Sequence, residues 1–199
     1  MAVTIDLLDE GGPESVTMRE VGRRAGVSRT APYLHFHSKM DLLSAVAADT
    51  LRELVYTVEV LRRNGKAPED VLRQALQEYA AMARERPERF RLVFGYWADE
   101  SEELIEVATE ANALLVDLVT HCQDEGSLPP GDPWLLAATI RSFVHGVAVL
   151  DQAGHLFDRE RQPLDPRELI ESVLQLDRRS PLASSIRLTA VHRNSANTS

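Results

Sequence analysis

One stretch of this chain decides its fold: Thr17-Met-Arg-Glu-Val-Gly-Arg-Arg-Ala-Gly-Val-Ser-Arg-Thr-Ala-Pro-Tyr-Leu-His-Phe-His-Ser-Lys39. Thr17 and Glu20 form a T-x-x-E capping box, which predicts the start of a short helix. Gly26 supplies the backbone freedom that a tight turn needs, and Ser28 is placed to cap a second helix over residues 28–34. This order predicts a helix-turn-helix, a motif whose second helix enters the major groove of DNA.

The spacing of five features extends this prediction to a family. A turn glycine, a capping serine, a tyrosine, a His-Phe pair and a lysine occur in Ala25-Gly-Val-Ser-Arg-Thr-Ala-Pro-Tyr-Leu-His-Phe-His-Ser-Lys39, which is followed by Asp41-Leu-Leu. This pattern resembles the signature of the TetR family of transcriptional regulators. The resemblance implies an all-helical homodimer with two DNA-binding heads and a C-terminal ligand and dimerisation domain. It further implies a ligand-responsive repressor that binds a palindromic, double-stranded operator.

The bulk composition permits this interpretation. The chain has 199 residues, of which 44% are hydrophobic and 27% charged, as in a soluble globular protein with a substantial core. No run of about 18 apolar residues occurs, so we expect no membrane span. The N-terminal residues carry acids and no basic region, so we expect no secretory signal. The lone cysteine, Cys122, excludes an internal disulfide framework and fits a reducing cytoplasm.

The net charge of −9 is unusual for a DNA-binding protein until it is partitioned along the chain. From Thr17 to Lys39, five cations stand against Glu20 alone, which gives +4 and leaves −13 for the remainder. A basic face on an acidic body suits a phosphate-contacting head, because released counterions supply most of the affinity. A solvated helix face is the alternative, and the coincidence with a complete helix-turn-helix pattern favours DNA binding.

Eight residues of the predicted head are candidate contacts to DNA. The TetR resemblance assigns phosphate contacts to Thr17, Tyr33 and Lys39 by their positions in the motif. At the exposed start of the second helix, Arg29 is expected either to fork onto a guanine edge or to grip phosphate. His35 either meets phosphate or packs within the head. The full set is Thr17, Ser28, Arg29, Thr30, Ala31, Tyr33, His35 and Lys39.

Pro32 departs from the commonest form of the motif. Its ring removes a backbone amide near the end of the first helical turn and restrains Ala31. We therefore expect a recognition helix that is shortened or reshaped.

Beyond the head, the chain is predicted to form successive helices with short breaks, and no segment shows sustained strand alternation. The predicted architecture is all-α, with a three-helix head at residues 1–45, a helical bundle for ligand binding and dimerisation at 46–177, and a basic, flexible tail at 178–199. Start and stop signals place the helices after the recognition helix at 38–63, 68–85, 87–97, 101–125, 133–154 and 166–177.

A weaker resemblance concerns the C-terminal part. Phe143-Val-His-Gly-Val147 is similar to a TetR subgroup named for a Trp-His-Gly motif, although no tryptophan adjoins the histidine here. In the family the last long helices pair with their twofold mates, and four small residues of the 133–154 helix, Ala137, Ala138, Ser142 and Gly146, would allow close approach. Ordinary packing within one chain is the alternative. The candidate interface residues are Ala137, Ile140, Val144, Gly146 and Val147.

The TetR resemblance also implies an effector pocket for a largely apolar small molecule. The candidate wall residues, each of which core packing explains equally well, are Phe94, Trp97, Leu114, Leu118, His121 and Phe143. Asp117 and His121 are four residues apart, as are Asp151 and His155. No third ligand accompanies either pair, so neither a metal nor a cofactor is predicted.

Two other classes of function are weaker. A catalyst is disfavoured because the chain lacks a phosphate-cradling glycine loop and a G-x-S-x-G elbow. A helical, dimeric ligand-binding module with a decayed head is the second alternative, because the predicted first helix spans only residues 3–9 and is commonly longer and basic in the family. Ile5, Leu7 and Leu8 still supply packing for a head, which favours DNA binding.

Overall fold

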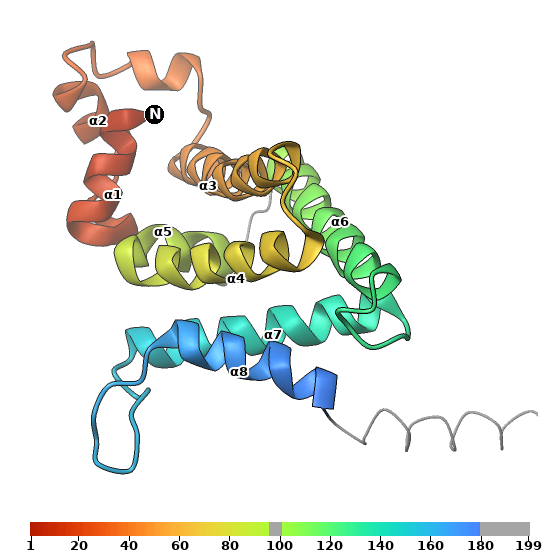
Figure 1. The fold of residues 1–199 in the computed structure, drawn as a ribbon. Helices are drawn as coiled ribbons and strands as arrows, with labels where there is room; N and C mark the ends of the chain where they lie inside the picture. The colour runs from red at the N-terminus through yellow and green to blue at the C-terminus, as the bar shows by residue number, and fades with distance from the viewer. Residues whose placement is uncertain (96–100, 180–199) are drawn as a thin grey trace, which may run out of the picture.

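Helices make up the regular structure of the described chain. The computed structural model describes residues 1–95 and 101–179, and within them it contains eight α-helices, one 3-10 helix and an isolated bridge between Phe157 and Pro163 (Figure 1). The all-α prediction is confirmed. The tail predicted at 178–199 lies, beyond residue 179, outside the described residues.

The head is built from α1 (Ala2–Ser15), α2 (Met18–Arg24), the 3-10 helix η1 (Ala31–Leu34) and the start of α3 (Lys39–Arg63). Helix α1 runs beyond the predicted residues 3–9 and bends where Gly11 and Gly12 leave helical geometry. Leu7 and Leu8 are buried in the head, as their apolar spacing predicted. The first helix is therefore long enough to form one wall of the head.

Helix α3 joins the head to the body. It begins as predicted, because the Ser38 hydroxyl accepts a hydrogen bond of 3.0 Å from the amide of Asp41. Its 25 residues make it roughly 37 Å long at 1.5 Å per residue. The proposed domain boundary at residue 45 falls inside this continuous helix, so the head and the body share one rigid element.

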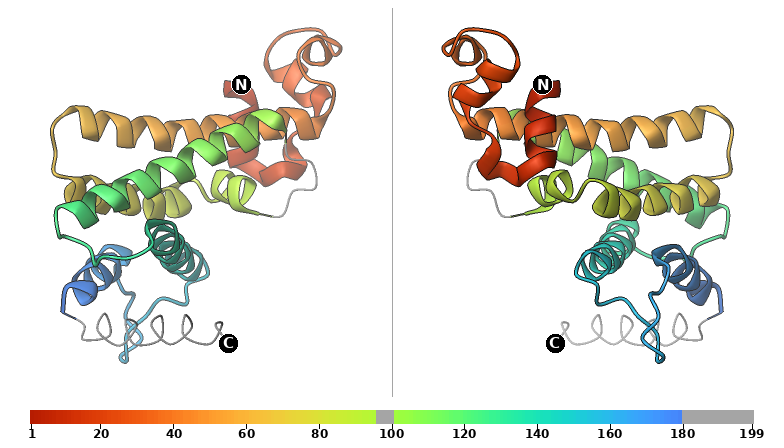
Figure 2. Two further views of the ribbon diagram at one scale, coloured as in Figure 1. Left: turned by 90° about the vertical axis from the view of Figure 1, so that its right-hand side faces the viewer. Right: turned by 90° about the vertical axis from the view of Figure 1, so that its left-hand side faces the viewer.

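The body consists of α4 (Pro68–Glu85), α5 (Pro87–Phe94), α6 (Glu102–Asp124), α7 (Pro133–Gln152) and α8 (Pro166–Arg179). Helix α4 lies in the middle, with α3 and α6 on one side and α7 and α8 on the other (Figures 1 and 2). The helix starts predicted from the capping residues are confirmed for α6 and α7. Ser101 accepts from the amide of Leu104 at 3.2 Å, and Asp132 accepts from the amide of Trp134 at 2.9 Å.

The short helix α5 makes a second connection between body and head. Its Leu92 is buried among head residues from α1 and α3, while its Phe90 is buried against α4 and α7. Arg89 forms a forked ion pair with Asp9 of α1, with Nε donating at 3.0 Å and Nη2 at 2.5 Å. Helix α5 therefore contacts both the first helix of the head and the core of the body.

Helix α7 is apolar on more than one side. By length and composition it is the one helix among residues 1–95 and 101–179 that could span a membrane. The search for an unbroken apolar run in the sequence did not find it, because Arg141 and several small polar residues interrupt the run. Only 28% of this apolar segment is buried, so α7 exposes apolar side chains to its surroundings.

The predicted dimer seam is wrong for four of its five residues. Ala137, Ile140, Val144 and Val147 are buried within the single chain, with 2–7% of their surface exposed. Side chains already covered in one chain have no surface left to contribute to an interface. Gly146 alone lies on the open side, where an added Cβ would meet nothing within 4 Å.

The exposed face of α7 is displaced from the buried row of Ala137, Ile140, Val144 and Val147 by about one residue position around the helix. Its large members are Trp134, Leu135, Val149 and Leu150, which are 63%, 68%, 43% and 44% exposed. Between them stand Ala138, Ser142 and Gly146, spaced four residues apart. We call this set the α7 face.

Candidate nucleic-acid interface and effector cavity

The turn of the helix-turn-helix forms as the sequence predicts. Gly26 adopts a φ of 69°, a left-handed conformation that costs glycine little because it has no Cβ. Gly22 lies opposite, and an added Cβ there would come within 3.0 Å of the carbonyl oxygen of Ser28. The absence of a side chain at Gly22 therefore lets α2 approach the segment that follows the turn, while Gly26 supplies the backbone conformation of the turn itself.

The segment predicted as the recognition helix forms a short 3-10 helix and not an α-helix. Residues 31–34 form a single 3-10 turn, with the ring of Pro32 buried against the head. The predicted helix over residues 28–34 and its cap at Ser28 are therefore wrong. Thr30 occupies the capping position without a side-chain bond, and the Ser28 hydroxyl lies 3.2 Å from that of Thr30. The missing amide of Pro32 accounts for the shortening that was expected.

The eight candidate DNA contacts all belong to the head and none of them is fully buried. Six of them are exposed, while Ala31 and Lys39 are partly buried. Thr17 caps α2 by accepting from the amide of Glu20 at 3.1 Å. Tyr33 is 55% exposed, and Lys39 stands at the first turn of α3, with Nζ 3.8 Å from the fully solvated carboxylate of Glu14. The side chains assigned to phosphate and base contact are thus accessible.

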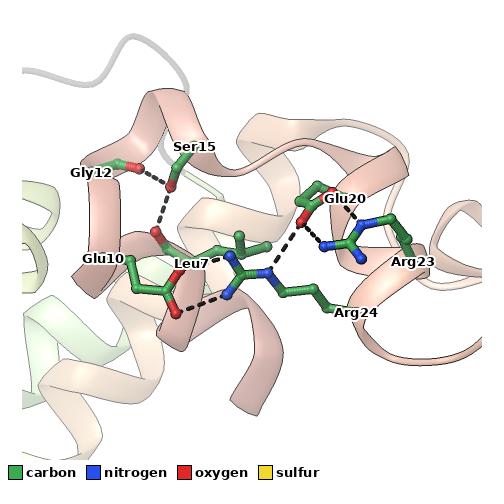
Figure 3. Close-up of polar contacts among 7 residues, drawn as sticks. All are labelled: Leu7, Glu10, Gly12, Ser15, Glu20, Arg23 and Arg24. Atoms are coloured by element: carbon green, nitrogen blue, oxygen red, sulfur yellow. Dashed lines mark hydrogen bonds and ion pairs between the residues drawn. The ribbon is translucent and has the colours of Figure 1, made fainter.

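Two arginines counted in the local charge of +4 are held by acids of the head (Figure 3). Glu20 accepts from Arg23 Nη2 at 2.6 Å and from Arg24 Nε at 3.1 Å. Arg24 also donates to Glu10 of α1 at 2.8 Å. Hydrogen bonds from Arg23 and then Arg24 lower the pKa of Glu20 to about 2, so this carboxylate is ionised at neutral pH.

This ion-pair network is a structural feature that the count of charges in the sequence missed. The spacing of Glu20, Arg23 and Arg24 along one helix is a usable signal, since side chains three and four residues apart face each other. The contact of Arg24 with Glu10 carries no such signal, because the two residues are 14 positions apart and meet only through the packing of α1 on α2. The head therefore presents less free positive charge than its composition indicates.

Removing the acid at the centre of the network should strengthen DNA binding. Glu20→Gln keeps the size of the side chain and releases most of the hold on Arg23 and Arg24, so we expect roughly three- to tenfold tighter binding to nonspecific duplexes with a steeper salt dependence. Glu125→Gln, an exposed change at the C-terminal end of α6, is the matched control. Fluorescence anisotropy across a salt series measures both. Equal isotherms for the two variants would show that these arginines do not face DNA.

The body contains a cavity of about 400 Å³ between α3, α4, α5, α6 and α7. This volume falls in the range of roughly 300–1,000 Å³ that is typical of small-ligand sites. Its wall is largely apolar, with a few polar groups at Glu78, Tyr79, Asn112 and Arg141. The apolar wall includes Leu51, Leu54, Val58, Val93, Phe94, Leu104, Leu114, Leu115 and Leu118.

The cavity brings together half of the predicted pocket residues. Phe94, Leu114 and Leu118 line it. Trp97 lies outside the described residues. His121 does not line it, because this part of α6 has passed the end of the cavity and the exposed ring contacts the backbone oxygen of Asp117 at 2.7 Å. Phe143 does not line it either, because its ring packs into the core between α4, α7 and α8.

An aromatic cluster connects the cavity wall to α5 and α7. The Tyr79 hydroxyl lies 2.8 Å from His145 Nδ1, and the His145 ring stacks on Phe90 with centroids 5.5 Å apart. Phe94 contacts both Tyr79 and Phe90 with ring centroids 5.0 and 4.9 Å apart. Burial raises the pKa of Tyr79 and lowers that of His145, so both are neutral near pH 7. Sequence reasoning missed Tyr79 and His145, which come from different helices.

Among the residues that the structure describes, no group of three His, Cys, Asp or Glu side chains is placed to hold a metal ion. Asp117 pairs with Arg62 at 2.7 Å through one carboxylate oxygen, and its other oxygen lies 3.5 Å from His121 Nδ1. Asp151 pairs with Arg84 at 3.0 Å. Both carboxylates are therefore engaged by arginines.

Known proteins resemble this chain along most of its length. The HTH-type transcriptional activator FasR of Mycolicibacterium smegmatis is 27% identical over 170 residues, which cover 82% of this chain and 73% of FasR. Two solved structures share the fold. A protein of unknown function from Rhodococcus sp. RHA1 has a TM-score of 0.77 at 24% identity, covering 89% of this chain and 91% of its own. The fatty acid degradation regulator FadR from Bacillus halodurans has a TM-score of 0.67 at 17% identity, covering 88% and 90%.

Two family models match the head and the body separately. Bacterial regulatory proteins of the tetR family match residues 1–46, and the tetracyclin repressor-like C-terminal domain matches residues 72–176, which is more than half of the chain. The finer likeness to the Trp-His-Gly subgroup stays a prediction. The chain therefore belongs to the TetR family and is a DNA-binding transcriptional regulator.

Proposed function

We propose that this regulator binds a palindromic operator as a homodimer and that an effector in the cavity changes its affinity for that operator. The proposal rests on one observation: the helix-turn-helix and the cavity are connected by the same two helices, α3 and α5. An exposed helix-turn-helix stands at one end of α3 and α5, and residues of the same two helices line a ligand-sized cavity. A regulator of this kind acts through binding and not through catalysis.

The α7 face supports a dimer. Monomeric soluble proteins rarely leave a long apolar stripe uncovered, and the small side chains of Ala138, Ser142 and Gly146 allow a second helix to approach closely. A twofold pairing of this face with the same face of a second copy would bury Leu135 and Val149. We assign the apolar character of α7 to this contact and not to a lipid bilayer, and we place the protein in the cytoplasm.

The coupling between cavity and head follows from the shared helices. Leu51, Leu54 and Val58 of α3 line the cavity, and the same helix carries Lys39 at the DNA end. Val93 and Phe94 of α5 line it too, while Leu92 is buried in the head. An effector that binds better to one tilt of α3 and α5 shifts the population toward that tilt. The spacing of the two heads then no longer fits successive major grooves, which lie about 34–36 Å apart.

We propose repression as the direction of control, since a dimer on an operator blocks access to the DNA it covers. Activation is the second candidate, because the relative FasR is a transcriptional activator. Transcription in vitro from a promoter that contains the operator decides between them, since added protein lowers the transcript level in one case and raises it in the other.

Selection of this protein against random duplexes tests the proposed function. The expected result is enrichment of a palindrome whose half-sites are separated by about one helical turn. Failure to enrich any sequence, with a folded dimeric protein, would favour the module with a decayed head.

Phosphate and base contacts in the head are separable by mutation. Lys39→Ala should weaken binding to all duplexes alike and reduce the slope of log K against log salt by about 0.9. Arg29→Ala should do the same if it grips phosphate, and should relax preference at one base pair if it reads guanine. Lys66→Ala, in the turn after α3 at its far end, is the control. Isotherms that match the control at every salt concentration would remove this surface from the DNA contact.

A further inference from the structure

The cavity carries one cation that no acid of the described chain neutralises. Arg141 of α7 lines the cavity and donates a hydrogen bond to the side-chain oxygen of Asn112 on α6. Among residues 1–95 and 101–175, whose side chains are described, no carboxylate forms an ion pair with it. This distinguishes Arg141 from arginines such as Arg62, Arg73 and Arg89, each of which is paired with an acid.

The positive charge reaches the aromatic end of the cavity. Burial lowers the pKa of His145, and the charge of Arg141 lowers it further. Burial raises the pKa of Tyr79, and Arg141 opposes that rise. Glu78, the acid on the cavity wall, is exposed to solvent, as Arg141 is, and of these two charges only that of Arg141 shifts the pKa of Tyr79 and His145. A ligand that reaches Tyr79 therefore meets the charge of Arg141.

Apart from Glu78, Asn112 and the two threonines Thr57 and Thr109, the rest of the wall is apolar. Side chains of α3, α5 and α6, among them Leu54, Phe94 and Leu114, surround the remaining volume. An aliphatic segment placed there would leave water for an apolar environment, at a gain of about 25 cal/mol for each Å² buried. The cavity thus offers one site for an anion and a larger space for an apolar chain.

We propose that the effector is an amphiphile with a single anionic head group at Arg141 and an aliphatic tail against α3, α5 and α6. The inference rests on the proposed function, because it names the class of effector for that site. A guanidinium beside an apolar wall binds a carboxylate or phosphate through charge-assisted, often forked hydrogen bonds. The same guanidinium interacts less strongly with a neutral head group and repels a cationic one.

Calorimetry with four probes of equal chain length tests the charge, with the ionic probes kept below their micelle concentrations and dodecanol below its solubility limit. Dodecanoate and dodecyl phosphate should bind at one site per protomer, and the ratio of their affinities shows which anion the site prefers. Dodecanol should bind about tenfold more weakly, and dodecyltrimethylammonium more weakly still. Binding of dodecanol as tight as that of dodecanoate would overturn the inference.

Variants of Arg141 locate the head group. Arg141→Gln should weaken dodecanoate about tenfold, to the level of dodecanol, and leave dodecanol unchanged. Arg141→Lys should restore part of the loss because it keeps the charge. Arg63→Gln, whose side chain is 70% exposed on α3 away from the cavity, is the matched control. Equal dodecanoate affinity in Arg141→Gln and in the control would contradict the assignment.

A variant that fills the cavity locates the tail. Ala111 lines the cavity from α6 and belongs to none of the buried core clusters, so Ala111→Phe should fold and weaken the three binding probes together. Unchanged binding in a folded Ala111→Phe protein would place the ligand elsewhere and overturn the inference.

The experiments distinguish a failure of the proposed function from a failure of the proposed effector class. A protein that selects a palindrome but prefers dodecanol keeps the proposed function and loses the anionic effector. A protein that binds dodecanoate through Arg141 but selects no DNA keeps the ligand class and loses the function. If the proposed function and the proposed effector class are both correct, dodecanoate changes the operator affinity of the wild type and not that of Arg141→Gln.

Discussion

Phe90→Ala is expected to lower the free energy of unfolding by about 3–5 kcal/mol. The Phe90 ring is 2% exposed and lies where α5 meets α4 and α7, in contact with Tyr79, Phe94 and His145. Its removal would leave a cavity that these rings cannot fill without breaking the hydrogen bond between Tyr79 and His145. For a chain of this size the loss corresponds to a drop of roughly 6–20 °C in Tm.

Phe157→Ala is the matched control for this measurement. Phe157 is 40% exposed in the loop between α7 and α8, and its ring contacts the guanidinium of Arg161 at 4.6 Å. We expect its loss to cost about 1 kcal/mol or less. Denaturant unfolding of both variants compares them directly. A Phe90→Ala protein as stable as Phe157→Ala would mean that the aromatic cluster does not hold α5 in place.

Leu135→Glu on the α7 face is expected to convert the dimer to a monomer at micromolar concentration. The twofold contact would bury two carboxylates without partners, at a cost of several kcal/mol. Operator affinity should fall at least about 100-fold, equivalent to ~2.7 kcal/mol, although the residue is far from DNA. Sedimentation velocity measures the oligomeric state, and anisotropy on the operator measures the affinity.

Tyr56→Glu separates this effect from a general cost of a surface charge. Tyr56 is 66% exposed, close to the 68% of Leu135, but lies on α3 and does not line the cavity. It should leave the dimer and operator binding unchanged. A dimeric Leu135→Glu protein would move the interface away from the α7 face, and a wild-type monomer would remove the dimer altogether.

Local signals in the sequence were sufficient for most of the fold. Caps at Ser38, Ser101 and Asp132 and the breaks at glycine and proline act within one helical turn, so they placed α3, α6 and α7 closely. The recognition element was harder. Pro32 was seen to disturb it, but whether one turn of 3-10 helix or a short α-helix remains depends on packing against Gly22.

The errors at the site arise where packing between helices decides. Both sides of α7 are apolar, so periodicity gave no means to tell the buried row with Ala137 and Val144 from the exposed row with Ala138 and Ser142. The cavity depends on how α3, α5 and α6 diverge, which no local pattern encodes. Phe94, Leu114 and Leu118 were found by their apolar type, whereas Arg141 and Tyr79 were not.

The spacing of half-sites tests most directly the claim that one rigid dimer places two heads on DNA. An insertion of five base pairs at the centre of the selected operator turns one half-site by about half a helical turn relative to the other. Binding is measured by anisotropy on the original and the lengthened duplex at one salt concentration. We predict that affinity falls about 100-fold, to that of a single half-site, because the second head no longer reaches its groove. An unchanged affinity would contradict the account, since it would show that each head binds DNA independently of the other.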